Sequence, residues 1–244
     1  MIANYNRAVF LSLLAALLLL LIVQPQLVTV PMGQLILTAL ASLLQIAAIF
    51  YLSENRKLRV FAWAFGLPAL LALWGRHCVN ESAQETAMVW SHFLTSVFLA
   101  VTAVLILRYV MTHDITADSV VAAICAYLLI GVVVGHMCFI VETLDPGAFR
   151  AADELTAEIT DPDSRSAILM YYSFSTLTTT GYGDIVPARP LTRTMAWIEA
   201  ATGQLFLAVL IAGIVSMRAS QRFARGPTLG RSHGEHPHEI HSLE

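Results

Sequence analysis

Residues 178–184 read Thr-Thr-Thr-Gly-Tyr-Gly-Asp, a polar stretch with two glycines between long apolar segments. Irregular backbone at membrane depth is tolerated only where it is buried in protein or lines a water-filled path. Glycine adopts backbone angles that other residues avoid, so Gly181 and Gly183 allow successive carbonyl groups to turn the same way. A ring of such carbonyls can replace the water shell of a cation. The stretch therefore indicates an ion path through a membrane.

The composition is that of an integral membrane protein. The chain has 244 residues, of which 57% are hydrophobic and 13% charged, and its mean hydropathy is +0.69. A soluble domain would carry roughly a quarter charged residues. The sequence has no nucleic-acid patch, no phosphate-binding glycine loop and no catalytic triad. We therefore expect the lipid bilayer as partner, no nucleic acid, no evident soluble partner, no organic cofactor and no enzymatic activity.

Six apolar segments approach the ~20 residues that cross a bilayer. They are residues 8–23, 33–52, 60–74, 87–110, 119–141 and 191–217. A signal peptide is the alternative for the first segment, but Gln24-Pro25-Gln26 makes a poor cleavage site. Residues 166–178 are apolar and aromatic but too short to span. We expect an all-α membrane protein with six transmembrane helices and a re-entrant helix that carries the chain to Thr179 halfway through the membrane.

The basic residues predict the orientation, because Lys and Arg accumulate in cytoplasmic loops. With six spans, they fall on one side: Arg7, Arg56, Lys57, Arg59, Arg108, Arg218, Arg222 and Arg225. Both termini are then cytoplasmic, in a plasma membrane that we expect to be a bacterial inner membrane. Residues 142–165 hold seven acids against two bases, which predicts either an anionic external vestibule or a loop that is only solvated.

The order helix, acidic loop, re-entrant helix, Thr179-Thr180-Gly181-Tyr182-Gly183-Asp184, helix resembles the pore of the potassium channel superfamily. The signature of that family is Thr-x-Gly-Tyr-Gly-Asp, and the usual Val or Ile at the variable position is Thr180. The resemblance covers about residues 119–218 and suggests a prokaryotic six-transmembrane channel with one pore loop. One chain supplies one filter segment, so the resemblance implies a homotetramer around a central pore.

The resemblance also implies roles for single residues. The backbone carbonyls expected to coordinate K⁺ are those of Thr179, Thr180, Gly181 and Tyr182. Gly183 would close the outer end and Asp184 would anchor the filter from behind. Some family members place a carboxylate partner for this Asp on the re-entrant helix, where this chain has Ser175. Glu199 lies in the apolar last span. We expect its side chain either to support the filter from behind or to face the cavity as a charge.

The last span also carries candidates for gating. Gly203 lies 20 residues after Gly183, where resembling channels often have a hinge glycine, and close helix packing is the alternative. One helical face then carries Gln204, Leu207, Ala208, Ile211 and Val215. Hydrophobic rings of Leu207, Ile211 and Val215 could gate by dewetting, or these residues could simply pack against other helices.

We divide the chain into three parts. Residues 1–118 form a four-helix membrane domain that resembles a voltage sensor in topology only, because its fourth span has Arg108 as its single basic residue. Residues 119–218 form the pore domain. Residues 219–244 form a short cytoplasmic tail that we expect to be disordered; its histidines could also bind metal.

We therefore predict a K⁺-selective passive channel that conducts through a tetrameric Thr-Thr-Gly-Tyr-Gly filter and is not steeply voltage-gated. One alternative is a subunit of a K⁺ transport system, although such systems use four imperfect loops in one long chain. Another is a non-conducting membrane adaptor that keeps the pore module for assembly.

Overall fold

The structure, a computed structural model, describes residues 2–224 apart from 29, 31, 54–55 and 113–115. It confirms that the chain is mostly helical. The long helices are α1 (Ile2–Leu27), α2 (Gly33–Ser53), α3 (Arg56–Gly75), α4 (Glu81–Thr112), α5 (Ala117–Leu144) and α8 (Pro190–Ala224). Between α5 and α8 lie β1 (Phe149–Ala151), the 3-10 turn η1 (Asp153–Leu155), α6 (Thr156–Thr160), α7 (Pro162–Leu177) and β2 (Ile185–Pro187).

Within the described part of the chain, six helices are long and apolar enough to cross a membrane, judged by length and composition. These segments are Ala8–Leu27, Gly33–Leu52, Leu58–Gly75, Ser82–Thr112, Ala117–Leu144 and Pro190–Gly213. They coincide in position with the six apolar segments predicted from the sequence. Helix α8 continues past the boundary expected at residue 218, and the histidines of the tail lie outside the described residues.

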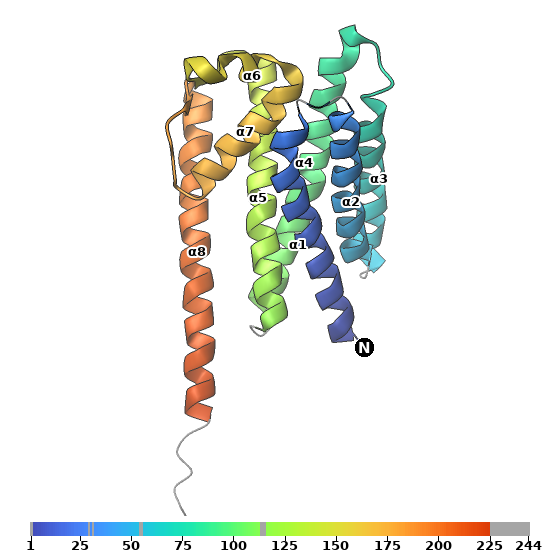
Figure 1. The fold of residues 1–244 in the computed structure, drawn as a ribbon. Coiled ribbons are helices and arrows are strands. Elements are labelled where there is room, and N and C mark those ends of the chain that lie inside the picture. The colour runs from blue at the N-terminus through green and yellow to red at the C-terminus, as the bar shows by residue number, and fades with distance from the viewer. Residues whose placement is uncertain (1, 29, 31, 54–55, 113–115, 225–244) are drawn as a thin grey trace, which may run out of the picture.

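Helices α1 to α4 lie side by side, and α5 stands between them and α8 (Figure 1). Helix α5 contacts α1, α4, α7 and α8. Apolar residues from α1, α2, α4 and α5 form the main core, whose largest fully buried members are Phe10, Leu13, Leu17, Leu44, Leu52, Phe98, Leu99, Ile106 and Leu129. Helices α1 and α4 therefore pack directly onto α5, and α2 and α3 pack against α1, α4 and each other. In a single chain, α8 exposes large apolar side chains between Leu205 and Val215.

Helix α7 slants between α5 and α8 beside their upper halves (Figure 1). It begins four residues before the predicted re-entrant helix, because Asp161 caps it: the Asp161 carboxylate accepts a hydrogen bond from the Ser164 amide at 2.9 Å. Pro162 occupies the first turn, where a missing amide proton costs nothing. The helix ends at Leu177, so it delivers the chain to the TTTGYGD segment, the name used below for residues 178–184.

A two-stranded antiparallel sheet ties the loop after α5 to the chain that leaves the TTTGYGD segment. Arg150 of β1 pairs with Val186 of β2, and the Ala152 amide donates to the Asp184 carbonyl at 2.8 Å. Strands of three residues carry too little pattern to be read from sequence, and they were not predicted. The sheet holds the outer end of the TTTGYGD segment against a structured loop.

Four of the seven acids in the acidic loop have local structural roles, and the choice between a vestibule and a solvated loop stays a prediction. The buried Glu142 carboxylate accepts the amides of Gly147 and Phe149, both at 2.8 Å. Asp145 pairs with an arginine of the loop before α8 at 3.3 Å, Asp161 caps α7, and Asp163 lines an internal cavity. The acids left fully exposed without such a role are Asp153, Glu154 and Glu158.

Candidate ion-binding site

The TTTGYGD segment folds back onto the C-terminal end of α7. The amides of residues 178–181 donate to the carbonyls of Phe174, Ser175 and Thr176 over 2.9–3.1 Å. The Ser175 carbonyl accepts two of these bonds, from Thr180 and Gly181. Ser175, expected among the residues that support the filter, therefore contacts the segment through its backbone. These bonds fix residues 178–181 relative to the C-terminal end of α7.

Backbone angles alternate along the segment. The φ angle is +59° at Thr179, +56° at Gly181 and +80° at Gly183, so every second residue is left-handed. Alternation of right- and left-handed residues turns successive peptide groups the same way. Glycine adopts these angles freely, whereas a β-branched residue such as Thr179 is strained there by about 1–3 kcal/mol. The alternation is the local geometry that a ladder of carbonyls directed at a cation requires.

The three threonine hydroxyls are hydrogen-bonded within the segment and its supports. The Thr178 hydroxyl donates to the Phe174 carbonyl at 2.7 Å and lies 2.9 Å from the Thr180 hydroxyl. Because the Thr178 proton is committed to that carbonyl, Thr180 is the donor in the second contact. Thr180 stands where the resembling family has Val or Ile, and this bond satisfies the polar group that the substitution introduces. The Thr179 hydroxyl donates to the Thr178 carbonyl at 2.7 Å.

Asp184 is anchored by a residue that the sequence analysis did not name. The Tyr171 hydroxyl donates to Asp184 Oδ2 at 2.6 Å, and the Ile185 amide donates to Oδ1 at 3.0 Å. The bond to Asp184 raises the pKa of Tyr171 to about 12, because ionising the phenol would place two negative charges together. The rings of Tyr171 and Tyr182 are nearly parallel, with centroids 6.3 Å apart. Tyr171 lies one helical turn before Ser175, the position at which a partner for Asp184 was looked for in the sequence. That spacing on the same helical face could have indicated Tyr171 as the partner.

Glu199 lies against α7. Its side chain is buried, and Oε1 is 2.5 Å from the Ser173 hydroxyl, which in turn donates to the Gly131 carbonyl at 2.8 Å. Its second oxygen, Oε2, has no hydrogen-bond partner among the described residues. Glu199 of α8 is therefore linked to Gly131 of α5 through Ser173. Ser173 belongs to α7, the helix that directly precedes the TTTGYGD segment.

Gly203 lies where α8 and α7 come closest. A Cβ atom at this position would lie 1.9 Å from the Leu177 carbonyl oxygen, so only glycine permits the contact. Helix α8 runs through this point from Pro190 to Ala224. Close packing at Gly203 is therefore observed, and its role as a hinge stays a prediction.

The gate candidates are solvent-accessible in a single chain. Leu207, Ile211 and Val215 are 40%, 59% and 60% exposed, respectively. Gln204, on the same face, donates from Nε2 to the Thr179 hydroxyl at 2.8 Å. The structure thus brings one end of this face to the TTTGYGD segment, and the gating role of the three apolar residues stays a prediction.

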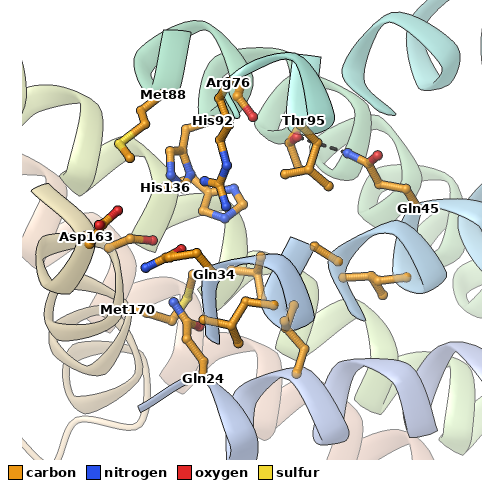
Figure 2. A pocket seen from close by; sticks show the side chains of 18 of the residues that line it. Gln24, Gln34, Gln45, Arg76, Met88, His92, Thr95, His136, Asp163 and Met170 are labelled. Carbon is orange, nitrogen blue, oxygen red and sulfur yellow. Dashed lines mark hydrogen bonds between the residues drawn. The ribbon is translucent and has the colours of Figure 1, made fainter. Parts of the chain in front are cut away.

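A second polar site lies between the N-terminal helices and α7. The site is a cavity of about 70 Å³ lined by side chains from α1 to α5 and α7, together with Arg76 directly after α3. Figure 2 shows its labelled polar residues. Arg76 donates to the Thr38 hydroxyl at 3.0 Å, and the rings of His92 and His136 have centroids 4.6 Å apart. Asp163 enters from α7. The members of this cluster are far apart along the chain, so the cluster could not be predicted from the sequence.

Burial and charge act against each other in this cavity. Burial lowers the pKa of Arg76, and the Asp163 carboxylate opposes that shift. Burial also raises the pKa of Asp163, with a further contribution from Asp161, while Arg76 opposes it. Three buried atoms of the lining have no hydrogen-bond partner among the described residues: Arg76 Nε, His136 Nδ1 and Gln45 Oε1. The cavity is large enough to hold water that could satisfy them.

Comparison with known proteins agrees with this geometry. Residues 123–219 match a family model described as "Ion channel". The matched range begins in α5 and includes α7, the TTTGYGD segment and most of α8. No curated protein and no solved structure matched the chain. The chain thus contains a segment of the ion-channel type, and with its apolar helices it is a membrane protein; the match leaves residues 1–122 without an assignment.

Proposed function

We propose that this protein is a K⁺-selective passive channel in which four chains surround one pore. The observation that carries the proposal is the alternation of left-handed angles at Thr179, Gly181 and Gly183, in a segment held by the end of α7. K⁺ is the substrate, and the carbonyls of residues 179–182 would replace its water shell. The match of residues 123–219 to ion channels supports conduction as the function.

The exposed apolar surface supports assembly into an oligomer. Tyr182 is 72% exposed in a single chain, although its ring already stacks on Tyr171. Large apolar residues are also exposed on several sides of α8, which in a bundle of four chains would meet neighbours as well as lipid. One TTTGYGD segment can coordinate a cation from one side only. A complete coordination shell therefore needs several copies of the chain arranged around an axis. A homotetramer meets both requirements.

We further propose that all six apolar helices span the membrane, that α7 is a re-entrant pore helix, and that both termini are cytoplasmic. This topology places the C-terminal end of α7 near mid-membrane, where its dipole favours a cation in the inner cavity. Basic side chains of the short loops support the orientation. Helix α4 has no series of basic residues, so we propose that voltage does not gate the channel steeply.

The test is ion flux through the purified protein in liposomes. We expect K⁺ flux that exceeds Na⁺ flux and that barium blocks, since Ba²⁺ is close to K⁺ in size and carries twice the charge. Gly181→Ala should abolish selective flux, because alanine is strained at the positive φ of +56° that the alternation along the TTTGYGD segment requires. Gly147→Ala is the matched control: this glycine also has a positive φ, +85°, and open space around it, but it lies in the loop after α5.

The outcomes separate the alternatives. A stable tetramer without flux at any voltage, pH or membrane tension would contradict the proposal and favour a non-conducting adaptor. Flux that appears only with a second protein would favour a subunit of a K⁺ transport system. Equal flux of K⁺ and Na⁺ through the wild-type protein would leave a channel but remove the selectivity.

A further inference from the structure

The structure assigns to Gln204 the role of a positioning residue that orients the Thr179 hydroxyl at the inner end of the ion path. This inference rests on the proposed function and deepens it. Gln204 follows Gly203 directly, and the close approach of α8 to α7 at Gly203 brings the glutamine side chain to the TTTGYGD segment. Its Nε2 atom lies 2.8 Å from the Thr179 hydroxyl oxygen.

The direction of this hydrogen bond follows from the protons available. A threonine hydroxyl has one proton and two lone pairs. The Thr179 proton is committed to the Thr178 carbonyl at 2.7 Å, so the glutamine must donate its amide proton to Thr179. One lone pair then accepts from Gln204 and the other stays free. The two bonds therefore hold the Thr179 hydroxyl in one orientation and keep its proton directed at the Thr178 carbonyl.

Orientation of this hydroxyl matters for a cation. A rotating hydroxyl presents its positive proton end for part of the time, whereas a fixed one presents its oxygen. Thr179 is also the only threonine of the segment with a positive φ, +59°, an angle that β-branched residues rarely adopt. The bond from Gln204 adds a restraint to this strained residue from a different helix. Loss of the bond should loosen the innermost binding position without removing any of its ligands.

The test uses the full-length protein in planar bilayers, with barium added from the cytoplasmic side and the K⁺-to-Na⁺ permeability ratio measured in parallel. Gln204→Leu keeps the side-chain size and removes the donor. We expect barium block weakened roughly 2- to 10-fold, the range that corresponds to one net hydrogen bond, together with a lower permeability ratio. Thr202→Val is the matched control, because the Thr202 hydroxyl bonds only to the Ile198 carbonyl of its own helix.

A double-mutant cycle separates positioning from a general effect on the pore. Thr179→Ala alone should weaken block at least as much as Gln204→Leu, because it removes the hydroxyl itself. The double variant should be no worse than Thr179→Ala, because the contact with Gln204 is already lost. Thr179→Ser keeps the hydroxyl and should retain the sensitivity to Gln204→Leu. Additive effects of Thr179→Ala and Gln204→Leu would overturn the inference.

The remaining outcomes are also decisive. Unchanged block and selectivity in Gln204→Leu would overturn the inference while leaving the proposed function intact. Absence of K⁺ flux in the wild-type protein would instead remove the proposed function. Gln204→Asn, whose amide is one methylene shorter, provides a second variant if Gln204→Leu does not assemble; if neither assembles, Gln204 is a structural residue and the positioning role is wrong.

Discussion

The Ser173 hydroxyl lies 2.5 Å from Glu199 Oε1 and 2.8 Å from the Gly131 carbonyl oxygen. The carbonyl can only accept a hydrogen bond, and serine has a single proton to give. Both contacts are hydrogen bonds at once if Ser173 donates to Gly131 and Glu199 donates to Ser173. The geometry therefore favours a protonated Glu199, a neutral group suited to its buried position in an apolar helix.

We expect Glu199→Gln to retain assembly and selective flux, because a glutamine amide can donate to Ser173 as the protonated acid does. Glu199→Ala should destabilise the folded protein by about 1–3 kcal/mol, since the contact between α8 and α7 is lost and a void remains. Thermal unfolding of the purified protein measures both effects. Infrared spectra should show a protonated carboxyl band that disappears in Glu199→Gln and persists in Glu158→Gln, an exposed control. Equal losses in Glu199→Gln and Glu199→Ala would contradict this interpretation.

The hydrogen bond between Tyr171 and Asp184 leads to a second prediction, which concerns the pH dependence of stability. The folded-state pKa of Tyr171 is raised to about 12 by its bond to Asp184, above the ordinary value of 10.0. A group whose pKa is raised by folding stabilises the folded state fully at pH values below its pKa in the unfolded chain. That stabilisation is lost as the pH rises through the folded-state pKa. We expect the stability of the folded protein to fall between those two pH values, as tyrosinate absorbance rises. Tyr171→Phe should remove that part of the alkaline loss; a variant that still loses the same stability over this range would show that another group is responsible.

The third prediction concerns the packing of α8 against α7 at Gly203. Gly203→Ala places a Cβ atom 1.9 Å from the Leu177 carbonyl oxygen, so α8 must move away from α7. Overpacking of this kind costs about 1–3 kcal/mol, and more where backbone cannot yield. We expect a large fall in the thermal midpoint of the purified protein and loss of the proposed selective flux. Gly75→Ala is the control, since nothing lies within 4 Å of a Cβ there. A stable Gly203→Ala channel with altered opening would instead support the hinge.

Several features could be predicted because they depend on local sequence. The long helices follow from apolar stretches of membrane-spanning length, and the short helix before Thr178 follows from an apolar run too short to span. The start of that helix was placed four residues late, because its signal was the cap Asp161-Pro162 and not hydropathy. The pairing of β1 with β2 was missed because three residues show no usable period.

Other features could not be predicted because they depend on which helices become neighbours. Glu142 was counted as a free acid of the vestibule, yet it accepts two amides of the turn that follows it. The bond from Gln204 to Thr179 joins residues 25 apart in sequence and exists only because α8 touches α7 at Gly203. Arg76 appears in sequence as a charge at the end of an apolar segment; the structure places it in a cavity lined by side chains from α1 to α5 and α7.

Arg76 makes the last prediction. Asp163, on α7, has a pKa raised by burial, and Arg76 is one of the groups that oppose this rise. Arg76→Met removes the cation, so the pKa of Asp163 in the folded protein should rise further. An acid with a raised folded-state pKa stabilises the fold most at low pH, and that stability is lost as pH rises through the folded pKa. The destabilisation by Arg76→Met should therefore be larger at about pH 8 than at about pH 4.

Thermal midpoints of the reconstituted protein across that pH range measure the effect. Arg76→Lys keeps a cation in the cavity and should show a weaker pH dependence than Arg76→Met. The double variant Arg76→Met/Asp163→Asn lacks the titrating carboxyl and should recover stability mainly at the upper end of the range. A loss that is the same at every pH, and that Asp163→Asn does not relieve, would show that Arg76 acts through its bond to Thr38 and its packing alone. The predicted pattern would instead establish that the N-terminal helices and α7 are coupled by charge across the cavity.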